Sequence, residues 1–371
     1  MAANLISGHG LTPGILTSPH LHLVEERFEH GLQAMTRDQF ASAVAELAPI
    51  VDLCVERSGD GITYFELTVA LAYAWFAEKA VDAAVIETGL GGRLDATNAA
   101  LSEVAVVTTI GLEHTAYLGD TIAKIAAEKF AILDEGKLLV TGDLHPDAQL
   151  VAEKVAAERG ATWFNAGRDF SVTDEVLTDG GWTFDIHSIY EEYSDVELRL
   201  RGRHQIRNFA TAVAAVEALF GRALDEAGVR QAAATVTTPG RMEILGAEPL
   251  LMVDGAHNPE AMVALAAALR EEMPGVRWEI VFGTMADKDM PAMLEPFREL
   301  VTAMHAVAVD SPRARPAAET ASIVESAFDM PVAAHDSTSA ALDAAIASGN
   351  PVLVTGSIYL VGEARAAFSG E

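Results

Sequence analysis

Residues 250–259 read Leu-Leu-Met-Val-Asp-Gly-Ala-His-Asn-Pro, an apolar run that stops at an acidic residue and a glycine. A run bounded in this way is typical of a buried strand followed by a turn. The pattern recurs toward the C-terminus, with an alanine-rich amphipathic stretch between runs. The further expected strands are 278–282, 306–309, 331–334 and 352–354. This alternation predicts a doubly wound parallel α/β sheet, with the residues that follow its strands at one edge.

The first part of the chain shows a similar alternation, interrupted once. Between Thr162 and Arg201, short alternating segments surround Thr178-Asp179-Gly180-Gly181, which is typical of a hairpin turn, so we expect an antiparallel β insertion there. A break near Thr238-Pro239-Gly240 precedes the C-terminal series. The expected strands of this part are 83–86, 104–108 and 138–140, and the expected domains are residues 1–244 and 245–371.

Composition excludes several classes of partner. The chain carries 25 Lys and Arg against 54 Asp and Glu, a formal charge of −29. Such a chain repels the phosphates of nucleic acids and of anionic membrane surfaces. No apolar stretch approaches the roughly 18 residues of a membrane span, the start lacks a secretory signal, and the single cysteine, Cys54, cannot form an intramolecular disulfide. We expect a cytoplasmic protein that binds neither nucleic acid nor membrane.

Two segments of the first part carry candidate chemistry. The strand at 83–86 runs into Glu87-Thr88-Gly89-Leu90-Gly91-Gly92-Arg93, where a carboxylate could meet a metal or substrate; a plain tight turn explains the glycines equally well. After His114 follows a helix for which we expect Asp120 as the cap. Its apolar stripe includes Lys129, where burial would favour a neutral, nucleophilic amine, although a lysine reaching out to solvent fits the same pattern. His114 alone is more typical of a structural histidine.

Further polar residues precede a helix and follow the C-terminal strands. Arg201 to Asn208 bring cations and amides to the start of the expected helix 209–220, a position that favours the binding of an anion. An ordinary solvated helix start has the same sequence pattern. Asp254, His257, Lys288 and Ser357 each follow an expected strand, so we expect His257, Lys288 and Ser357 at one sheet edge.

Taken together, these segments resemble the folylpolyglutamate synthase / dihydrofolate synthase branch of the Mur ligase superfamily. The resemblance covers nearly the whole chain and implies a P-loop-type ATPase domain followed by a Rossmann-like domain. The motifs that carry it are Thr17-Ser18-Pro19-His20-Leu21, Thr63-Tyr64-Phe65-Glu66, Glu87 to Asn98, Gly111 to Thr115, Glu128-Lys129, Gln205 with Asn208, Pro239 to Glu243, Asp254 to Pro259, Asp287-Lys288-Asp289 and Gly356-Ser357.

The family's chemistry is the ATP-dependent joining of L-glutamate to dihydropteroate or folyl-polyglutamate through an acyl phosphate. By resemblance, Ser18, Glu87 and His114 hold Mg²⁺, a carbamylated Lys129 holds a second Mg²⁺, and the protein is a monomer. The resemblance assigns the nucleotide to Gln205, Asn208, Arg241 and Asp254, the substrates to Phe65, His257, Lys288 and Ser357, and catalysis to Lys129, Arg241 and His257.

One family feature has no counterpart in the sequence. Members carry, before the Thr-Ser-Pro-His-Leu segment, a glycine-rich phosphate-binding loop whose backbone donors and lysine hold the ATP phosphates. The sequence therefore leaves two hypotheses open. Either the natural enzyme includes that strand and loop and is a complete ligase, or the chain is a non-catalytic folate- or nucleotide-binding homologue. A cell-wall Mur ligase fits less well, and the choice between first and later glutamates stays open.

Overall fold

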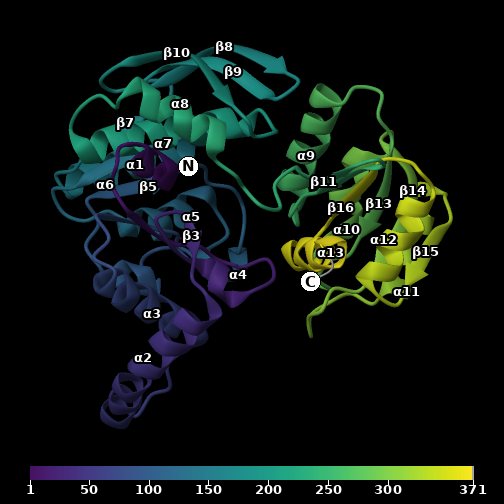
Figure 1. The fold of residues 1–371 in the computed structure, drawn as a ribbon, viewed down its shortest axis with the longest axis horizontal. Coiled ribbons are helices and arrows are strands. Elements are labelled where there is room, and N and C mark those ends of the chain that lie inside the picture. The colour runs from purple at the N-terminus through teal and green to yellow at the C-terminus, as the bar shows by residue number, and fades with distance from the viewer. Residues whose placement is uncertain (370–371) are drawn as a thin grey trace. The chain divides into compact units, whose positions relative to one another are not determined.

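The computed structural model describes residues 1–369 and divides into two compact units (Figure 1). The N-terminal unit comprises Met1–Arg199 and His204–Val236. The C-terminal unit comprises Leu200–Arg203 and the chain from Thr237 onward. Among the described residues, no helix has the length and apolar character needed to cross a bilayer.

Three sheets form the frame of the N-terminal unit. One mixed sheet has the order β3-β2-β1-β4, a parallel sheet has the order β5-β6-β7, and an antiparallel sheet has the order β10-β9-β8. The strands are β1 Pro13–Leu16, β2 Phe28–His30, β3 Gln33–Ala34, β4 Ala83–Ile86, β5 Val104–Val107, β6 Leu138–Thr141, β7 Thr162–Asn165, β8 Ser171–Thr178, β9 Gly181–His187 and β10 Glu192–Leu198. The expected strands at 83–86, 104–108 and 138–140 are thus confirmed.

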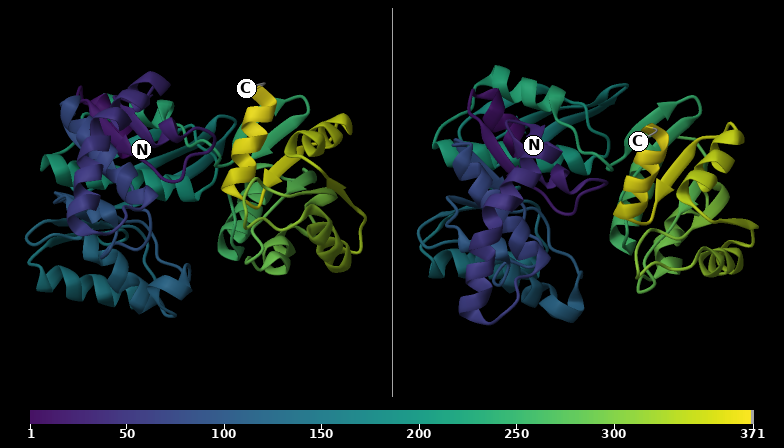
Figure 2. Two further views of the ribbon diagram at one scale, coloured as in Figure 1. Left: turned by 90° about the horizontal axis from the view of Figure 1, so that it is seen from below. Right: turned by 60° about the horizontal axis from the view of Figure 1, so that its bottom comes forward.

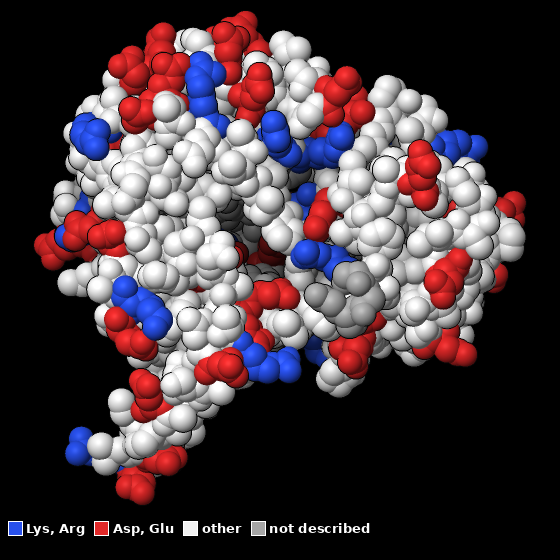
Figure 3. Space-filling model, in the orientation of Figure 1, with Lys and Arg blue, Asp and Glu red and all other residues white. Residues whose placement is uncertain are grey.

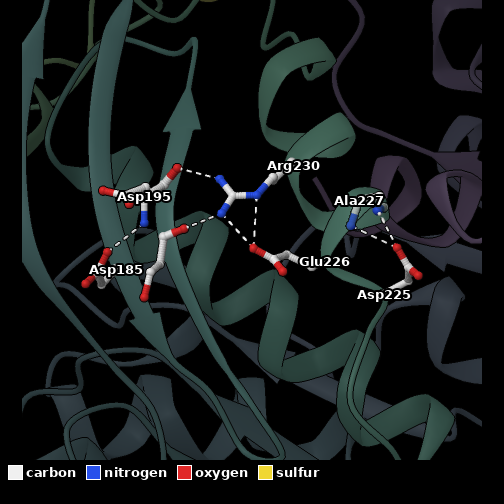
Figure 4. A network of polar contacts seen from close by, with 8 residues as sticks. Asp185, Asp195, Asp225, Glu226, Ala227 and Arg230 are labelled. Atoms are coloured by element: carbon white, nitrogen blue, oxygen red, sulfur yellow. Dashed lines mark hydrogen bonds and ion pairs between the residues drawn. The ribbon is translucent and has the colours of Figure 1, made fainter.

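The hairpin around Asp179-Gly180 is confirmed, but the antiparallel segment begins later than expected. Thr162–Asn165 pairs in parallel with β6, and the antiparallel strands start at Ser171. A bulge in β10 between Tyr193 and Val196 is tied to the neighbouring helix α8, because Arg230 donates to the carbonyls of Ser194 and Asp195, each at 2.7 Å (Figure 4). The arginine replaces hydrogen bonds that the irregular strand cannot make.

The helices of this unit cover the sheets. They are α1 Ala2–Gly8, α2 Arg37–Ser58, α3 Tyr64–Glu78, α4 Thr115–Leu118, α5 Ile122–Lys129, α6 Pro146–Glu158, α7 His204–Phe220 and α8 Glu226–Thr235. Helix α7 is the central one, since its apolar side chains are almost all buried and it contacts β5 and β6. Helix α1 packs against α7 and also against β1 and β4. Neighbouring helices therefore cover both the β1–β4 pair and the β5–β6 pair.

Helix α2 differs from the others because none of its 22 residues is fully buried. It begins at a capping box, in which the Thr36 side chain accepts from the Gln39 N–H, and it packs on α3. An almost wholly apolar cavity of about 270 Å³ lies between the two helices, lined by residues such as Phe40, Leu47 and Leu71. Packing holds α2 in place along one side only.

The C-terminal unit is the expected doubly wound sheet. Its strand order is β11-β12-β16-β13-β14-β15, and every pair is parallel except β11 with β12. Helices cover both faces of the sheet (Figure 2). The strands are β11 Glu243–Ala247, β12 Leu250–Val253, β13 Trp278–Phe282, β14 Val301–Val307, β15 Val332–His335 and β16 Val352–Thr355; the helices are α9 Pro259–Glu272, α10 Met290–Leu294, α11 Ala317–Phe328, α12 Thr338–Ala347 and α13 Ile358–Ser369.

The expectation of a strand at 306–309 was wrong in its limits, because β14 begins at Val301 and ends at Val307. His305 lies inside this strand and is 8% exposed. Because histidine is polar, it interrupts the apolar run from which the limits of the strand were predicted. Its ring nitrogens lie 3.0 Å from the Glu279 carboxylate on β13 and 3.0 Å from His335 Nε2 on β15. These hydrogen bonds allow the polar ring to be buried in the sheet.

The hydrogen-bonded pair of His305 and His335 predicts that the stability of the protein depends on pH. Burial, with the neighbouring His305, lowers the pKa of His335 below its usual 6.5, while Asp336 opposes the shift. The folded protein therefore resists a proton that the unfolded chain accepts. This contribution to stability is complete above pH 6.5 and is lost as the pH falls toward the folded-state pKa.

We expect H335Q to reduce the loss of Tm between pH 7.5 and pH 5, because the glutamine amide can bond His305 without titrating. Calorimetric unfolding of wild type and variant across this range measures the difference. The matched control is H145Q, since His145 is half-exposed on the other unit. An unchanged slope in H335Q would contradict this account.

Candidate active site

Two of the predicted metal ligands meet where strands β1 and β4 end. The strands pair in parallel, with Leu16 opposite Ile86, so the residues after each strand are neighbours. The Ser18 N–H donates to Glu87 Oε2 at 2.7 Å, and the Glu87 N–H donates to the Leu16 carbonyl at 2.9 Å. The backbone thus fixes the Glu87 carboxylate beside Ser18.

The glycine-rich segment after Glu87 is closed by one aspartate. Asp95 Oδ2 accepts from the N–H groups of Gly89 and Leu90, at 2.9 and 2.8 Å. Glycine is required at position 89, since a Cβ there would lie 2.5 Å from the ring of Phe65. The segment is therefore a packed turn against α3, and it places the Phe65 ring beside the loop. Thr63 and Glu66 around this ring form the capping box of α3.

Lys129 is the last residue of α5 and is half-buried, whereas Ile125 and Ala126 on the same face are fully buried. Within residues 1–369 its ammonium makes neither a hydrogen bond nor an ion pair. The expected cap of this helix was wrong: Thr121 accepts from the Lys124 N–H, and Asp120 instead pairs with the Lys124 ammonium at 2.8 Å. A threonine and an aspartate in succession both suit a cap, and local geometry selects between them.

His114 is placed by an unusual backbone. Its φ of 52° lies in the left-handed region, and it caps the short helix α4. The described part of the chain contains no group of three or more Asp, Glu, His or Cys side chains arranged to hold a metal. The structure brings Ser18 and Glu87 together, and the assignment of His114 and Lys129 as further ligands stays a prediction.

The start of α7 is less cationic than its sequence suggested. Arg203 pairs with Glu271 at 3.1 Å, and Arg201 pairs with the buried Glu272 at 3.4 Å, so acids of α9 neutralise both cations. Gln205 is 4% exposed and its side-chain oxygen accepts from the Asn208 amide at 3.1 Å. The two predicted nucleotide contacts therefore form one unit at the first turn of this helix.

Asp254 organises the turn after β12. It is 7% exposed, and its two oxygens accept from the N–H groups of Met242 and Ala256, at 2.9 and 2.8 Å. Burial raises the pKa of Asp254, while these two backbone donors and the charges of Arg241 and His257 oppose the shift. Arg241 lies over Gly255, where a Cβ would collide with its guanidinium.

His257 and Ser357 lie on neighbouring loops of the same edge. Strands β12 and β16 pair in parallel, and the Gly356 N–H donates to the Ala256 carbonyl at 3.0 Å. His257 Nδ1 is 2.9 Å from the Gly255 carbonyl. Because a carbonyl only accepts, Nδ1 carries a proton, and in the neutral imidazole Nε2 is then the nitrogen with the lone pair. Ser357 is 3% exposed at the start of α13.

Lys288 follows the next strand, β13, which pairs in parallel with β16. The expectation that His257, Lys288 and Ser357 share one edge is thus confirmed. The structure adds a residue that the sequence did not single out: Thr284 is fully buried in the same loop, and its hydroxyl has no partner among the described residues.

Comparison with known proteins agrees with this architecture. Residues 36–216 match the Mur ligase middle domain, and residues 240–358 match the Mur ligase glutamate ligase domain. The chain is 32% identical to the folylpolyglutamate synthase of Lacticaseibacillus casei, over 99% of this chain and 86% of that protein. It is 34% identical to the dihydrofolate synthase/folylpolyglutamate synthase of Mycobacterium tuberculosis, over 96% of this chain and 80% of that protein.

Solved structures agree as well. The Mycobacterium tuberculosis folylpolyglutamate synthase complexed with ADP and AMPPCP superposes with a TM-score of 0.94 at 32% identity, covering 99% of this chain and 87% of the other. A folylpolyglutamate synthase in complex with AMPPCP and folate gives a TM-score of 0.85 at 32% identity, covering 98% and 85%.

Asp254 allows a test of the C-terminal edge. We expect D254A to destabilise the protein by about 1–3 kcal/mol, because two buried N–H groups lose their acceptor. D254N keeps one acceptor oxygen and should cost less. Urea unfolding measures both, with D343A in the exposed face of α12 as the control. Equal stability of D254A and D343A would show that the carboxylate does not support the turn.

Proposed function

Because this chain belongs to the folylpolyglutamate synthase family of the Mur ligases, we propose that it joins L-glutamate to dihydropteroate, to folyl-polyglutamate, or to both. As a family member it is an ATP-dependent amino-acid ligase. The observation that carries the proposal is the match over nearly the whole chain, which spans both the middle and the glutamate ligase domains. The same match favours a ligase over a non-catalytic binding homologue.

The reaction has two steps. A carboxylate oxygen of the folate substrate attacks the γ-phosphorus of ATP, ADP leaves, and an acyl phosphate forms. The free amine of L-glutamate then attacks the acyl carbon, inorganic phosphate leaves, and the nitrogen gives up one proton and keeps one as the amide N–H. We assign the acceptance of one proton to His257 Nε2, because the Gly255 carbonyl holds the proton on Nδ1.

The remaining roles follow the charges of the substrates. Lys288 and Ser357 would bind the carboxylates of L-glutamate, and Phe65 would stack on the pterin ring. Arg241 would contact phosphate. Gln205, Asn208 and Asp254 would bind the nucleotide. The two carboxamides can donate and accept hydrogen bonds and the buried carboxylate can accept them, which suits the sugar and the base.

Ser18 and Glu87 fit part of a Mg²⁺ site, since the Ser18 N–H holds the Glu87 carboxylate next to a residue that carries a hydroxyl. Mg²⁺ takes few ligands from protein and completes its shell with water and phosphate oxygens. His114 and a carbamylated Lys129 would add a nitrogen and an oxygen ligand, and the Lys129 amine has no partner in the described chain that would hinder carbamylation. Bound Mg²⁺ would neutralise charge on the transferring phosphoryl group.

The ATP phosphates also need backbone donors, and we propose that a further parallel strand brings them to the N-terminal unit. Strands β4 and β5 are each at the edge of their sheet, and an edge strand presents unpaired N–H and C=O groups with which a further strand can pair. Apolar side chains nearby are exposed: Val106 at 39%, Leu94 at 81% and Leu101 at 82%.

Glutamate ligation is tested directly. We expect ATP-dependent incorporation of labelled glutamate when dihydropteroate and tetrahydrofolate are offered in parallel, and little with aspartate. E87Q should lose about 100-fold or more in kcat, since mutating even an outer-shell partner of a metal ligand costs roughly 10–100-fold in metal affinity or activity. E103Q, which only breaks a surface pair with Lys137, is the control. Equal rates for E87Q and E103Q would remove Glu87 from the site.

The open sheet edges are tested by amide exchange. We expect the amides of 83–86 and 104–107 to exchange faster in residues 1–371 than in a protein expressed with any in-frame codons that precede Met1. V106K should be tolerated in the shorter chain and should lower the activity of the longer one. A stop codon directly before Met1, or equal exchange in both proteins, counts against the additional strand.

A further inference from the structure

The loop that follows β13, residues 283–289, contains Lys288 and is held by a second loop. The Arg315 N–H donates to the Thr284 carbonyl at 2.9 Å, and the Ala286 N–H donates to the Arg313 carbonyl at 2.9 Å. Met285 and Ala314 form an isolated antiparallel bridge between these bonds. The two loops are therefore joined backbone to backbone for a few residues only.

One guanidinium extends this short contact to Lys288. Arg315 Nη2 donates to the Ala286 carbonyl at 2.5 Å and to the Lys288 carbonyl at 3.3 Å. Its Nη1 is paired with Glu319 in the first turn of α11. A planar guanidinium can bind a carboxylate and two carbonyls at once, which a lysine ammonium on a flexible stem cannot reproduce.

The burial of Arg315 sets it apart from other arginines of this unit. Its side chain is 12% exposed, against 48% for Arg298, and its Nε atom is buried without a partner in the described chain. A buried cation is costly unless its hydrogen bonds hold it. The 283–289 loop, whose carbonyls accept hydrogen bonds from this guanidinium, is therefore confined to the conformation that places those carbonyls beside it.

We propose that Arg315 is a positioning residue that fixes the 283–289 loop and so determines where the Lys288 ammonium lies. The inference rests on the proposed function, in which Lys288 binds a carboxylate of L-glutamate. Arg315 acts through the backbone of the loop, and Glu319 orients the guanidinium.

The test compares R315K with R298K in the full chain. Arg298 is the matched control, because it also pairs with a glutamate and donates to a carbonyl. That carbonyl belongs to Ala327 near the end of α11, whereas Glu319, the partner of Arg315, lies near its start. We expect R315K to raise the KM for L-glutamate roughly tenfold or more, the effect of one lost charge-assisted bond. The KM for ATP should change less than twofold, and E319Q should give an intermediate effect.

A second measurement separates this inference from the proposed function. Hydrogen exchange of the Ala286 and Lys288 amides should be faster in R315K than in wild type and unchanged in R298K, whether or not the chain ligates glutamate. Absence of product from wild type would overturn the proposed function alone. Unchanged exchange in R315K, or a parallel fall of Tm and of kcat/KM for every substrate, would overturn the positioning role.

Discussion

The parallel pairing of short apolar strands is the constraint on which the polar edges depend. Leu16 opposite Ile86 places Ser18 beside Glu87, and Val253 opposite Val354 brings the loop of His257 to that of Ser357. In each case the side chains that matter lie just after the strand, so their separation is set by backbone hydrogen bonds rather than by their own contacts. Burial of apolar side chains determines which segments form strands. The register of their pairing then places the polar residues that follow them at one edge of the sheet.

The strands could be predicted from the sequence wherever an apolar run ended in a turn residue, as at Val253-Asp254 and Ile86-Glu87. Prediction failed where long-range partners decide the outcome. His305 interrupts an apolar run but is accepted in β14 through Glu279 and His335. Thr162–Asn165 alternates like an antiparallel strand, yet it pairs in parallel with β6. Neither partner is visible in a local window of sequence.

The candidate site shows the same division. Sequence spacing brought His257, Lys288 and Ser357 together because each follows a strand of the same sheet. It missed Arg315, which lies between prolines in Pro312-Arg313-Ala314-Arg315-Pro316 and looks like a solvated loop. It also overestimated the free cations near α7, because Glu271 and Glu272 neutralise them. In a chain with 54 acids, acidic groups are scattered over the surface (Figure 3), and a cation close to another element finds one easily.

Helix α2 has a consequence for how this chain can change over generations. With no fully buried residue and packing along one side only, it offers many positions where substitutions shift stability by roughly 0.5 kcal/mol or less. Sequence drift should therefore accumulate there faster than in α7, whose interior face is closed. The helix is a natural place for lineages to acquire new surface properties while the strand edges stay unaltered.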